Sequence, residues 1–311
     1  DSTVAAKLFA LALPPERLKL LHVDNGLMRL NESEEVCRMF DDLGLSEAFE
    51  FIDASEDFLA ALDGLIEPEA KRRAIGDTFV EVFDREARRL GIEDHLLGQG
   101  TIYPDTVETG GTKRAHVIKT HHNRVPIIEA LIAEGKVIEP LADLYKVEVR
   151  ELAEKLGVPS ELIWRHPFPG PGLGVRLLCS DGQVQAPDVA EKLDAIAHSF
   201  GLSAHALPIR SVGVKADLRC YEHPVLLSGD APWEDLLEAT RLILKDVPDV
   251  NRCIWNLGEA PKAFTPIAAG MTRSRLDILR TCDHFAMSGL RRHGLYDDIW
   301  QCPTAMIPLT I

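Results

Sequence analysis

Apolar runs alternate with amphipathic segments from residue 18 to about residue 157 of the chain. Leu18 to Val23 and Phe49 to Ala54 are short apolar runs of the kind that forms buried parallel strands. Pro68 to Leu90 repeats its apolar residues at helical spacing and predicts a long amphipathic helix. This alternation of strands and helices predicts an α/β fold built on a doubly wound parallel sheet.

The pattern changes after Leu177. Two segments, Asp188 to Phe200 and Glu234 to Leu244, predict amphipathic helices. The predicted strands are Leu207 to Val214, Tyr221 to Leu227 and Asn251 to Leu257. Strand, strand, helix and strand in this order indicate a small α+β domain. We therefore predict one domain over residues 1–175 and a second over residues 176–311.

The composition is ordinary for a globular protein. With 311 residues, of which 46% are hydrophobic and 27% charged, the chain is long enough for two domains. A net charge of −15 argues against general binding to nucleic acids or anionic membranes, which needs a positive surface. No apolar run reaches membrane-spanning length. The six cysteines show no CxxC pair and no metal-ligand spacing, so we expect reduced thiols in a cytoplasmic protein.

Residues suited to binding a nucleotide are concentrated between Gly98 and Asn123. A glycine-rich turn, in which backbone amides can approach an anionic ligand, consists of Gly98, Gln99, Gly100 and Thr101. Asp105 and Glu108 follow as hard oxygen ligands of the kind that magnesium takes. These residue types in one short segment predict a site for a nucleotide and a metal ion.

The same segment ends in cationic and imidazole side chains. Lys119, His121 and His122 follow a glycine-rich loop at residues 110–113, and their donors suit phosphate oxygens. Together they suggest a lid that closes over a nucleotide. Taken singly, each of these features is common on protein surfaces, so the residues alone leave a solvated surface loop as the alternative.

A second unusual stretch is ELIWRHPFPGPGLGVR at residues 161–176. Three prolines and three glycines fall between Pro167 and Gly174, which excludes a helix or a central strand. The stretch is either a domain linker or a rigid wall that brings backbone close to a planar ligand. Its apolar residues, among them Trp164, Phe168 and Leu173, favour the wall, because linkers are usually polar.

Four motifs resemble those of the GMP synthetase family. LLGQGTIYPDTVE and VIKTHHN are similar to motifs of its ATP pyrophosphatase domain, and LPIRSVGVKADLRCY is similar to its dimerisation domain. RHPFPGPGLGVR is similar to the stretch that bridges these two domains in the family. The resemblance implies an adenine nucleotide alpha-hydrolase-like sheet over residues 1–175. It also implies a homodimer formed through the α+β domain at residues 176–311.

The resemblance implies a ligase of purine biosynthesis. The expected reaction is the ATP-dependent amination of XMP to GMP through an adenyl-XMP intermediate, with release of AMP and pyrophosphate. Ammonia is expected to come from glutamine through an amidotransferase domain or subunit outside this chain. The cofactors implied are ATP and Mg²⁺.

The resemblance also assigns roles to residues. Asp1 and Ser2, in DSTV, match the end of the pyrophosphate loop, and Val23 lies where the adenine is held. The remaining ATP contacts implied are Gly98, Gln99, Gly100 and Thr101. Those expected to hold magnesium are Asp1, Asp105 and Glu108, and those expected to act in catalysis are Lys119, His121, His122 and Asp105. The expected XMP contacts are Pro169, Gly170, Pro171, Gly172 and Arg219.

Two alternatives remain open. Another ATP pyrophosphatase, such as NAD synthetase or a tRNA-thiolating enzyme, lacks a match to HPFPGPGLG, and the negative net charge argues against tRNA. A non-catalytic nucleotide-binding and dimerisation module is the other alternative. It is suggested because the chain contains neither the glycine half of the phosphate loop nor the lysine-proline-proline tail of the family. Thr265 to Leu309 resembles the longer, eukaryote-like members, and we expect further sequence beyond both ends.

Overall fold

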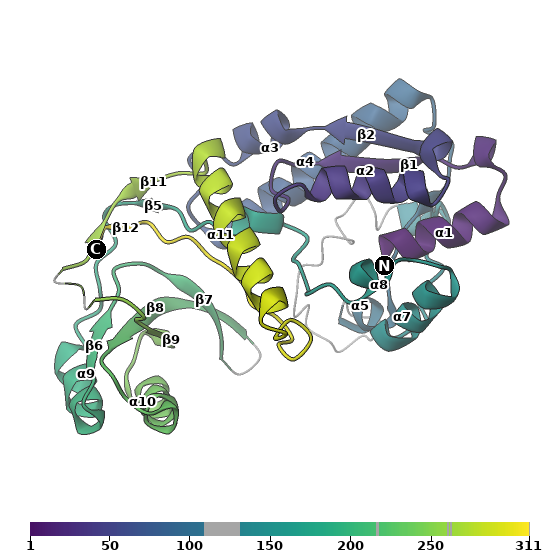
Figure 1. Ribbon diagram of the computed structural model, residues 1–311. Helices are drawn as coiled ribbons and strands as arrows, with labels where there is room; N and C mark the ends of the chain where they lie inside the picture. The colour runs from purple at the N-terminus through teal and green to yellow at the C-terminus, as the bar shows by residue number, and fades with distance from the viewer. Residues whose placement is uncertain (109–130, 216–217, 260, 262, 311) are drawn as a thin grey trace. The chain divides into compact units, whose positions relative to one another are not determined.

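The computed structural model describes residues 1–108, 131–215, 218–259, 261 and 263–310. These residues form α/β structure that divides into two compact units (Figure 1). The first unit consists of Asp1–Asp63, Glu67–Leu177 and Met271–Thr304. The second unit consists of Gly64–Ile66, Leu178–Gly270 and Ala305–Ile311.

The described strands of the first unit pair in parallel. β1 (Leu20–Asp24) pairs with β2 (Phe49–Asp53) along its whole length. β3 (Leu97–Gly98) pairs with β4 (Val137–Ile138). Parallel strands joined through helices confirm the α/β class predicted from the sequence. They also direct attention to the carboxyl ends of the strands, where open α/β sheets bind their ligands.

Helices connect and cover these strands. The α-helices of the first unit are α1 (Ser2–Ala12), α2 (Glu32–Asp42), α3 (Ser55–Ala61), α4 (Pro68–Leu90), α5 (Tyr103–Glu108), α7 (Lys146–Lys155), α8 (Ser160–Ile163) and α11 (Arg273–Arg292). Its short 3₁₀ segments are η1 (Pro15–Arg17), η2 (Ser46–Ala48) and η3 (Gly172–Val175). Among the described residues, no helix is both long and apolar enough to cross a membrane.

Local sequence explains the bounds of the longest of these helices. α4 begins at Pro68, whose fixed φ and missing N–H suit the first position of a helix. It ends before Gly91, which takes a left-handed φ of 65°. Ile75 and Val82 are buried on one face. The helix predicted over Pro68 to Leu90 is confirmed at both ends.

Two hydrophobic clusters hold α1 in the first unit. Val4 and Ala5 belong to one cluster together with Leu141. Ala6 belongs to the other, together with Phe40 of α2. Packing on two sides fixes the amino end of α1, which carries the residues that the sequence assigns to a phosphate site.

α11 returns the chain to the first unit after the second unit is complete. Leu276 and Leu279 are fully buried along this helix. The change of unit at Leu177 lies beside the boundary predicted from the sequence, but Met271–Thr304 belongs to the first unit. The two functional domains, a synthetase domain over residues 1–175 and a dimerisation domain over residues 176–311, stay a prediction.

The second unit is centred on one long strand. β8 (Leu218–Ser228) pairs antiparallel with β6 (Ser203–Ala206) and β7 (Ser211–Lys215), and parallel with β9 (Val250–Trp255). The flanking helices are α9 (Ala190–Ala197), η4 (His198–Phe200) and α10 (Trp233–Asp246). Two small antiparallel pairs complete it: β5 (Ser180–Asp181) with β11 (Ala268–Ala269), and β10 (Thr265–Pro266) with β12 (Leu309–Thr310).

One predicted strand of this unit is partly wrong. The sequence predicted a strand over Leu207 to Val214, whereas β7 begins at Ser211. Pro208 has no N–H to donate to a ladder, so the chain bends there between two strands. The strand that ends before this bend, β6, was not predicted, because its sequence SAHA carries little strand propensity.

Candidate active site

The turn that follows β1, residues 24–28, is built by its own polar side chains; we call it the β1 turn. Asp24 Oδ1 accepts the N–H of Gly26 at 2.8 Å, and Asn25 Oδ1 accepts the N–H of Leu27 at 2.9 Å. Gly26 has a φ of 68°, and a Cβ there would lie 2.8 Å from the Cβ of Ser55. Glycine is therefore required where the turn crosses the start of α3.

Residues 166–174, which we call the proline-glycine segment, pack on the β1 turn. The N–H of Leu173 donates to the carbonyl of Leu27 at 2.8 Å. Gly172 has a φ of 59°, and a Cβ there would lie 2.4 Å from the same carbonyl oxygen. Pro171 and Gly172 are buried, whereas Gly170 is exposed. This half of the segment is a packed wall of the first unit and not a solvated linker.

The start of the segment is anchored to the loop after α11. The backbone N–H of His166 donates to the hydroxyl of Tyr296 at 3.0 Å, and its Nε2 lies 2.7 Å from the carbonyl of Tyr296. The two rings stack with their centroids 4.0 Å apart. A ring hydrogen bond to a carbonyl places the proton on Nε2.

A buried carboxylate of α11 holds two arginines beside the same segment. Asp283, 2% exposed, lies 3.2 Å from Arg29 Nε and 3.3 Å from Arg176 Nη1. Both guanidinium groups also lie over the ring of Phe168, at 4.4 and 5.0 Å from its centroid. Burial lowers the pKa of Arg176, Arg29 lowers it further, and Asp283 opposes this effect. Asp283 thus keeps two partly desolvated cations in place.

Residues 98–101, where β3 ends and the next turn begins, pack against α1; we call them the β3 turn. A Cβ at Gly98 would lie 2.5 Å from the ring of Phe9, and a Cβ at Gly100 would lie 2.6 Å from the backbone nitrogen of Ser2. Between them, the N–H of Gln99 donates to the carbonyl of Ile138 in β4 at 2.9 Å. Glycine is therefore needed at Gly100, where the neighbour is backbone, whereas a side chain at Gly98 would have to displace the ring of Phe9. Thr101, which follows, is almost completely buried.

Lys146, the first residue of α7, faces the amino end of α1. Its Nζ lies 2.6 Å from Asp1 Oδ1. Burial lowers the pKa of Lys146, the positive charges of Arg150 and Arg165 lower it further, and Asp105 opposes them. Arg150, Arg165 and Asp105 therefore lie within electrostatic range of Lys146. A lysine is disfavoured at the positive end of a helix, so its position here requires another partner, which Asp1 provides.

A series of polar contacts leads from the neighbourhood of Lys146 to the β1 turn. Arg165, whose charge acts on Lys146, lies 3.2 Å from Glu32 Oε1. The other oxygen of Glu32 accepts the backbone N–H of Arg29 at 3.0 Å. Arg29 in turn contacts Asp283. These contacts run from Arg165, near Lys146, to Arg29, which directly follows the β1 turn.

Two of the three predicted magnesium ligands, Asp1 and Asp105, can be examined in the structure. Asp1 and Asp105 supply the hard oxygen atoms that magnesium prefers, but Asp1 contacts Lys146, and Asp105 Oδ2 accepts the N–H of Ile102 at 3.2 Å. Among the residues that the structure describes, no group of three or more His, Cys, Asp or Glu side chains is arranged to hold a metal. The two carboxylates fit magnesium in kind, and further oxygen ligands have to come from a nucleotide or water.

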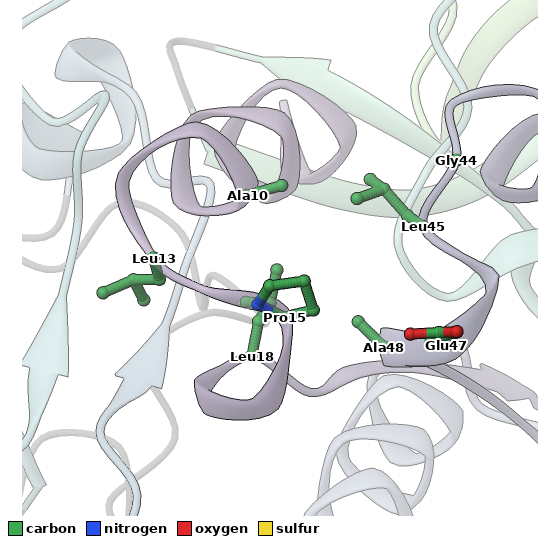
Figure 2. A pocket seen from close by; sticks show the side chains of 8 residues that line it. All are labelled: Ala10, Leu13, Pro15, Leu18, Gly44, Leu45, Glu47 and Ala48. Carbon is green, nitrogen blue, oxygen red and sulfur yellow. The ribbon is translucent and has the colours of Figure 1, made fainter.

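A pocket with mostly apolar lining lies at the amino ends of β1 and β2 (Figure 2). Its lining residues are Ala10, Leu13, Pro15, Leu18, Gly44, Leu45, Glu47 and Ala48. Leu18 precedes β1 and Ala48 precedes β2, so the pocket is at the amino ends of this parallel pair. It therefore lies apart from the predicted site residues at the carboxyl ends of the strands.

Comparison with known proteins gives one consistent result. The probable GMP synthase (glutamine-hydrolyzing) of Leptospira interrogans is 41% identical over 317 residues, covering 99% of this chain and 52% of that protein. GMP synthase of Paraburkholderia phymatum is 42% identical over 298 residues, with 85% and 55% covered. GMP synthase of Heliobacterium modesticaldum is 40% identical over 292 residues, with 84% and 54% covered. This chain is homologous to GMP synthases. No protein-family model matches the chain.

The chain spans about half the length of the GMP synthases it matches. The Leptospira protein is similar along nearly the whole chain, whereas the other two cover 84–85% of it. The resemblance to GMP synthetase that the sequence motifs indicated is thereby confirmed. The region from Thr265 to Leu309, which resembles the longer members, has a counterpart in a bacterial GMP synthase, because so little of the chain is left unmatched.

Several site residues predicted from the sequence by resemblance to GMP synthetase have side chains outside the part of the chain that the structure describes. These residues are Glu108, Lys119, His121, His122 and Arg219. Val23 is described, and its side chain is buried in β1 with 9% exposed. Pro169, at the start of the packed wall, is half-buried.

Sequence reasoning missed two charged residues that the structure places beside predicted motif segments: Lys146, which contacts Asp1, and Asp283, which contacts Arg29 and Arg176. Lys146 lies in LYKVEVR, a segment that the motif comparison reached without assigning it a role. A cation at the start of a helix was the available signal. Asp283 lies more than a hundred residues from either arginine, and an acid within an otherwise amphipathic helix gives no signal of burial in the sequence.

Proposed function

We propose that this chain is the synthetase part of a GMP synthase and catalyses the ATP-dependent amination of XMP to GMP. The observation that carries the proposal is 41% identity to a probable GMP synthase along 99% of the chain. Supporting it, motif residues from α1, the β1 turn, the β3 turn and the proline-glycine segment lie within one unit. The proposal includes the doubly wound parallel sheet of ATP pyrophosphatases, to which β1 to β4 would belong.

The proposed reaction has two steps. The 2-oxygen of XMP attacks the α-phosphorus of ATP, and the bond to pyrophosphate breaks. Ammonia then bonds to C2 of the base, and AMP leaves with the oxygen. Transfer of this kind depends more on positioning and charge neutralisation than on covalent catalysis.

The amino end of α1 and the β3 turn are proposed to bind the phosphates of ATP. Ser2 opens α1, where free backbone N–H groups and the helix dipole favour an anion. Gly100 brings the backbone of the β3 turn to the same place without an intervening side chain. Lys146, which contacts Asp1, supplies a positive charge at this place.

Magnesium is proposed to bind at Asp1 and Asp105, with Glu108 as a third ligand. When bound, it would neutralise charge on the leaving pyrophosphate. Lysine and carboxylate would then exchange partners, with Asp1 turning to the metal and Lys146 to a phosphate oxygen. The lid roles of Lys119, His121 and His122, and the phosphate contact of Arg219, stay predictions of the resemblance.

Base recognition is proposed for the β1 turn and the proline-glycine segment. Val23 and the β1 turn would hold the adenine, and Pro169 to Gly172 would form the wall against the purine of XMP. Ammonia is proposed to come from glutamine through an amidotransferase domain or subunit. The working protein is proposed to be a cytoplasmic homodimer.

The test is pyrophosphate release from ATP and magnesium, with ammonium as the nitrogen source, measured with and without XMP. The expected result is XMP-dependent release, with one GMP and one AMP formed per pyrophosphate. The assay is run on this chain and on the whole gene product. ATP binding without XMP-dependent turnover in both would reject the proposal and favour a non-catalytic nucleotide-binding module.

A further inference from the structure

Arg280 of α11 reaches the β1 turn with its guanidinium group. Nε donates to the carbonyl of Met28 at 3.0 Å, and Nη2 donates to the carbonyl of Gly26. Nη1 donates to Asp277, one turn earlier on the same helix. The side chain is 14% exposed, so these hydrogen bonds are formed largely away from water. A single side chain thus bridges two backbone carbonyls that lie more than 250 residues away in the sequence.

Three successive carbonyls of the β1 turn are satisfied by remote parts of the chain. Gly26 and Met28 receive hydrogen bonds from Arg280, and Leu27 receives one from the N–H of Leu173. Gly26 and Leu27 are buried. A buried carbonyl without a donor is destabilising, so loss of Arg280 would favour rearrangement of this turn.

Two other residues of α11, one before and one after Arg280, also contact segments next to the β1 turn. Arg273, its first residue, donates to Ser55 Oγ at 3.2 Å, at the point where β2 leads into α3. Asp283, one turn after Arg280, holds Arg29 just after the β1 turn. Figure 1 shows α11 close to α3 at this end of the unit. α11 therefore contacts the chain at the carboxyl ends of both β1 and β2.

We propose that Arg280 is a positioning residue for ATP: it holds the β1 turn in the shape that receives the adenine. The inference rests on the proposed function, which assigns the adenine to Val23 and this turn. Arg280 need not contact the nucleotide, because its guanidinium is occupied by two carbonyls and Asp277. Its effect is on affinity for ATP and not on the chemical step.

The test compares Arg280→Ala, Arg280→Lys and Arg292→Ala. Arg292 is an exposed residue of the same helix and serves as the matched control. Calorimetry measures the Kd of a non-hydrolysable ATP analogue, and steady-state assays measure KM for ATP and XMP separately. Lysine keeps the charge but cannot bridge both carbonyls and Asp277 in one planar group.

Arg280→Ala is expected to raise both the Kd for the analogue and the KM for ATP by about tenfold, the effect of about one hydrogen bond's net free energy. KM for XMP and kcat are expected to change by less than about twofold, since Arg280 contacts Gly26, Met28 and Asp277 and none of the residues proposed to hold XMP. Arg280→Lys is expected to lie between alanine and wild type. Arg292→Ala is expected to match wild type in every measurement.

Unchanged affinity for ATP in a folded Arg280→Ala protein would overturn the inference. A similar rise in both KM values together with a similar fall in kcat would also overturn it, because such a result indicates a general structural defect. If the alanine variant does not fold, Arg280→Lys decides in the same way. Wild-type protein that binds the analogue but shows no XMP-dependent pyrophosphate release rejects the proposed function, and the analogue Kd values then still decide the role of Arg280.

Discussion

Gly172 illustrates how one residue constrains two separate motifs. Its left-handed φ of 59° excludes most side chains, and its Cα lies so close to Leu27 that a Cβ would come within 2.4 Å of a carbonyl oxygen. That oxygen belongs to the backbone and already accepts the N–H of Leu173. It cannot move aside without breaking the contact between the proline-glycine segment and the β1 turn.

Gly172→Ala is therefore expected to destabilise the first unit by about 3 kcal/mol, combining a left-handed backbone with overpacking. Gly44→Ala is the matched control, because Gly44 has a similar φ of 70° but nothing within 4 Å of its Cβ position. The control isolates the backbone effect and is expected to lose only about 1 kcal/mol. Urea unfolding of both variants measures the difference, and equal losses would contradict a steric role for Leu27.

His22 of β1 links stability to pH. Its Nε2 lies 3.0 Å from Ser33 Oγ, and its ring stacks near Phe49 and Phe51. Burial lowers the pKa of His22 below its ordinary value of 6.5, although Asp24 and, to a smaller extent, Glu32 oppose this shift. The unfolded chain therefore takes up this proton more readily than the folded protein.

The contribution of His22 to stability is fully present above about pH 6.5 and is lost as the pH falls below that value. We expect the free energy of unfolding to fall more steeply between about pH 7.5 and pH 5 in wild type than in His22→Gln. Urea unfolding at several pH values gives both slopes. Parallel slopes would show that His22 is as easily protonated in the folded protein as in the unfolded chain.

Asp105 tests the proposed metal site. Asp105→Asn keeps the size of the side chain and an oxygen that can accept the N–H of Ile102, but it removes the negative charge. We expect about a tenfold higher magnesium concentration for half-maximal pyrophosphate release, because magnesium prefers carboxylate oxygen. An exposed carboxylate with a surface partner, Glu238, provides the control variant Glu238→Gln. The same magnesium titration in Asp105→Asn and wild type would exclude a metal role.

At the scale of single residues, the sequence allowed us to identify residues whose type is unusual in their local sequence, such as clustered glycines. Glycines in GQGT and PGPGLG were identified as positions where backbone can approach a ligand. The structure shows other parts of the chain packed against Gly98, Gly100 and Gly172, and the approach of a ligand stays a prediction. Asp283 and Arg280 could not be identified in this way. Their types are ordinary in a surface helix, and only the folded chain shows that their partners lie far away in the sequence.

At the scale of elements, α11 is held by ions as well as by apolar packing. Asp283→Asn leaves Arg29 and Arg176 beside each other without a counter-charge. We expect a loss of about 3–5 kcal/mol in the free energy of unfolding, the usual effect of breaking a buried ion pair from one side. Chemical unfolding measures it. Glu238→Gln, which breaks an exposed pair on α10, is expected to leave the unfolding midpoint unchanged, and equal effects of the two changes would contradict burial of Asp283.

Elements with strong local signals were predicted well and weak ones were not. α4 has a proline at its start, a glycine after its end and regular apolar spacing, and both bounds were correct. β6 has four residues of low strand propensity and depends on pairing with β8, so local sequence did not reveal it. The presence of α11 in the first unit was not predicted either, because amphipathic spacing does not specify which core a helix joins.

At the scale of the whole molecule, nucleotide binding is expected to affect the two units differently. Hydrogen exchange measured with and without the ATP analogue should slow in peptides that contain the β1 turn and the β3 turn. Peptides from α10 in the second unit are expected to exchange at the same rate in both conditions, since no proposed ATP contact lies there. Equal slowing in both units would contradict the assignment of the adenine and phosphate sites to the first unit.

The return of the chain to the first unit has a consequence for how the protein is made. Because Met271–Thr304 belongs to that unit, its polypeptide is interrupted by most of the second unit. A ribosome releases residues from the amino end first, so Leu178–Gly270 emerges before α11 exists. Until Arg280 emerges, the carbonyls of Gly26 and Met28 lack their donor. The nascent β1 turn therefore takes its final shape only after Leu178–Gly270 and the first turns of α11 have been synthesised.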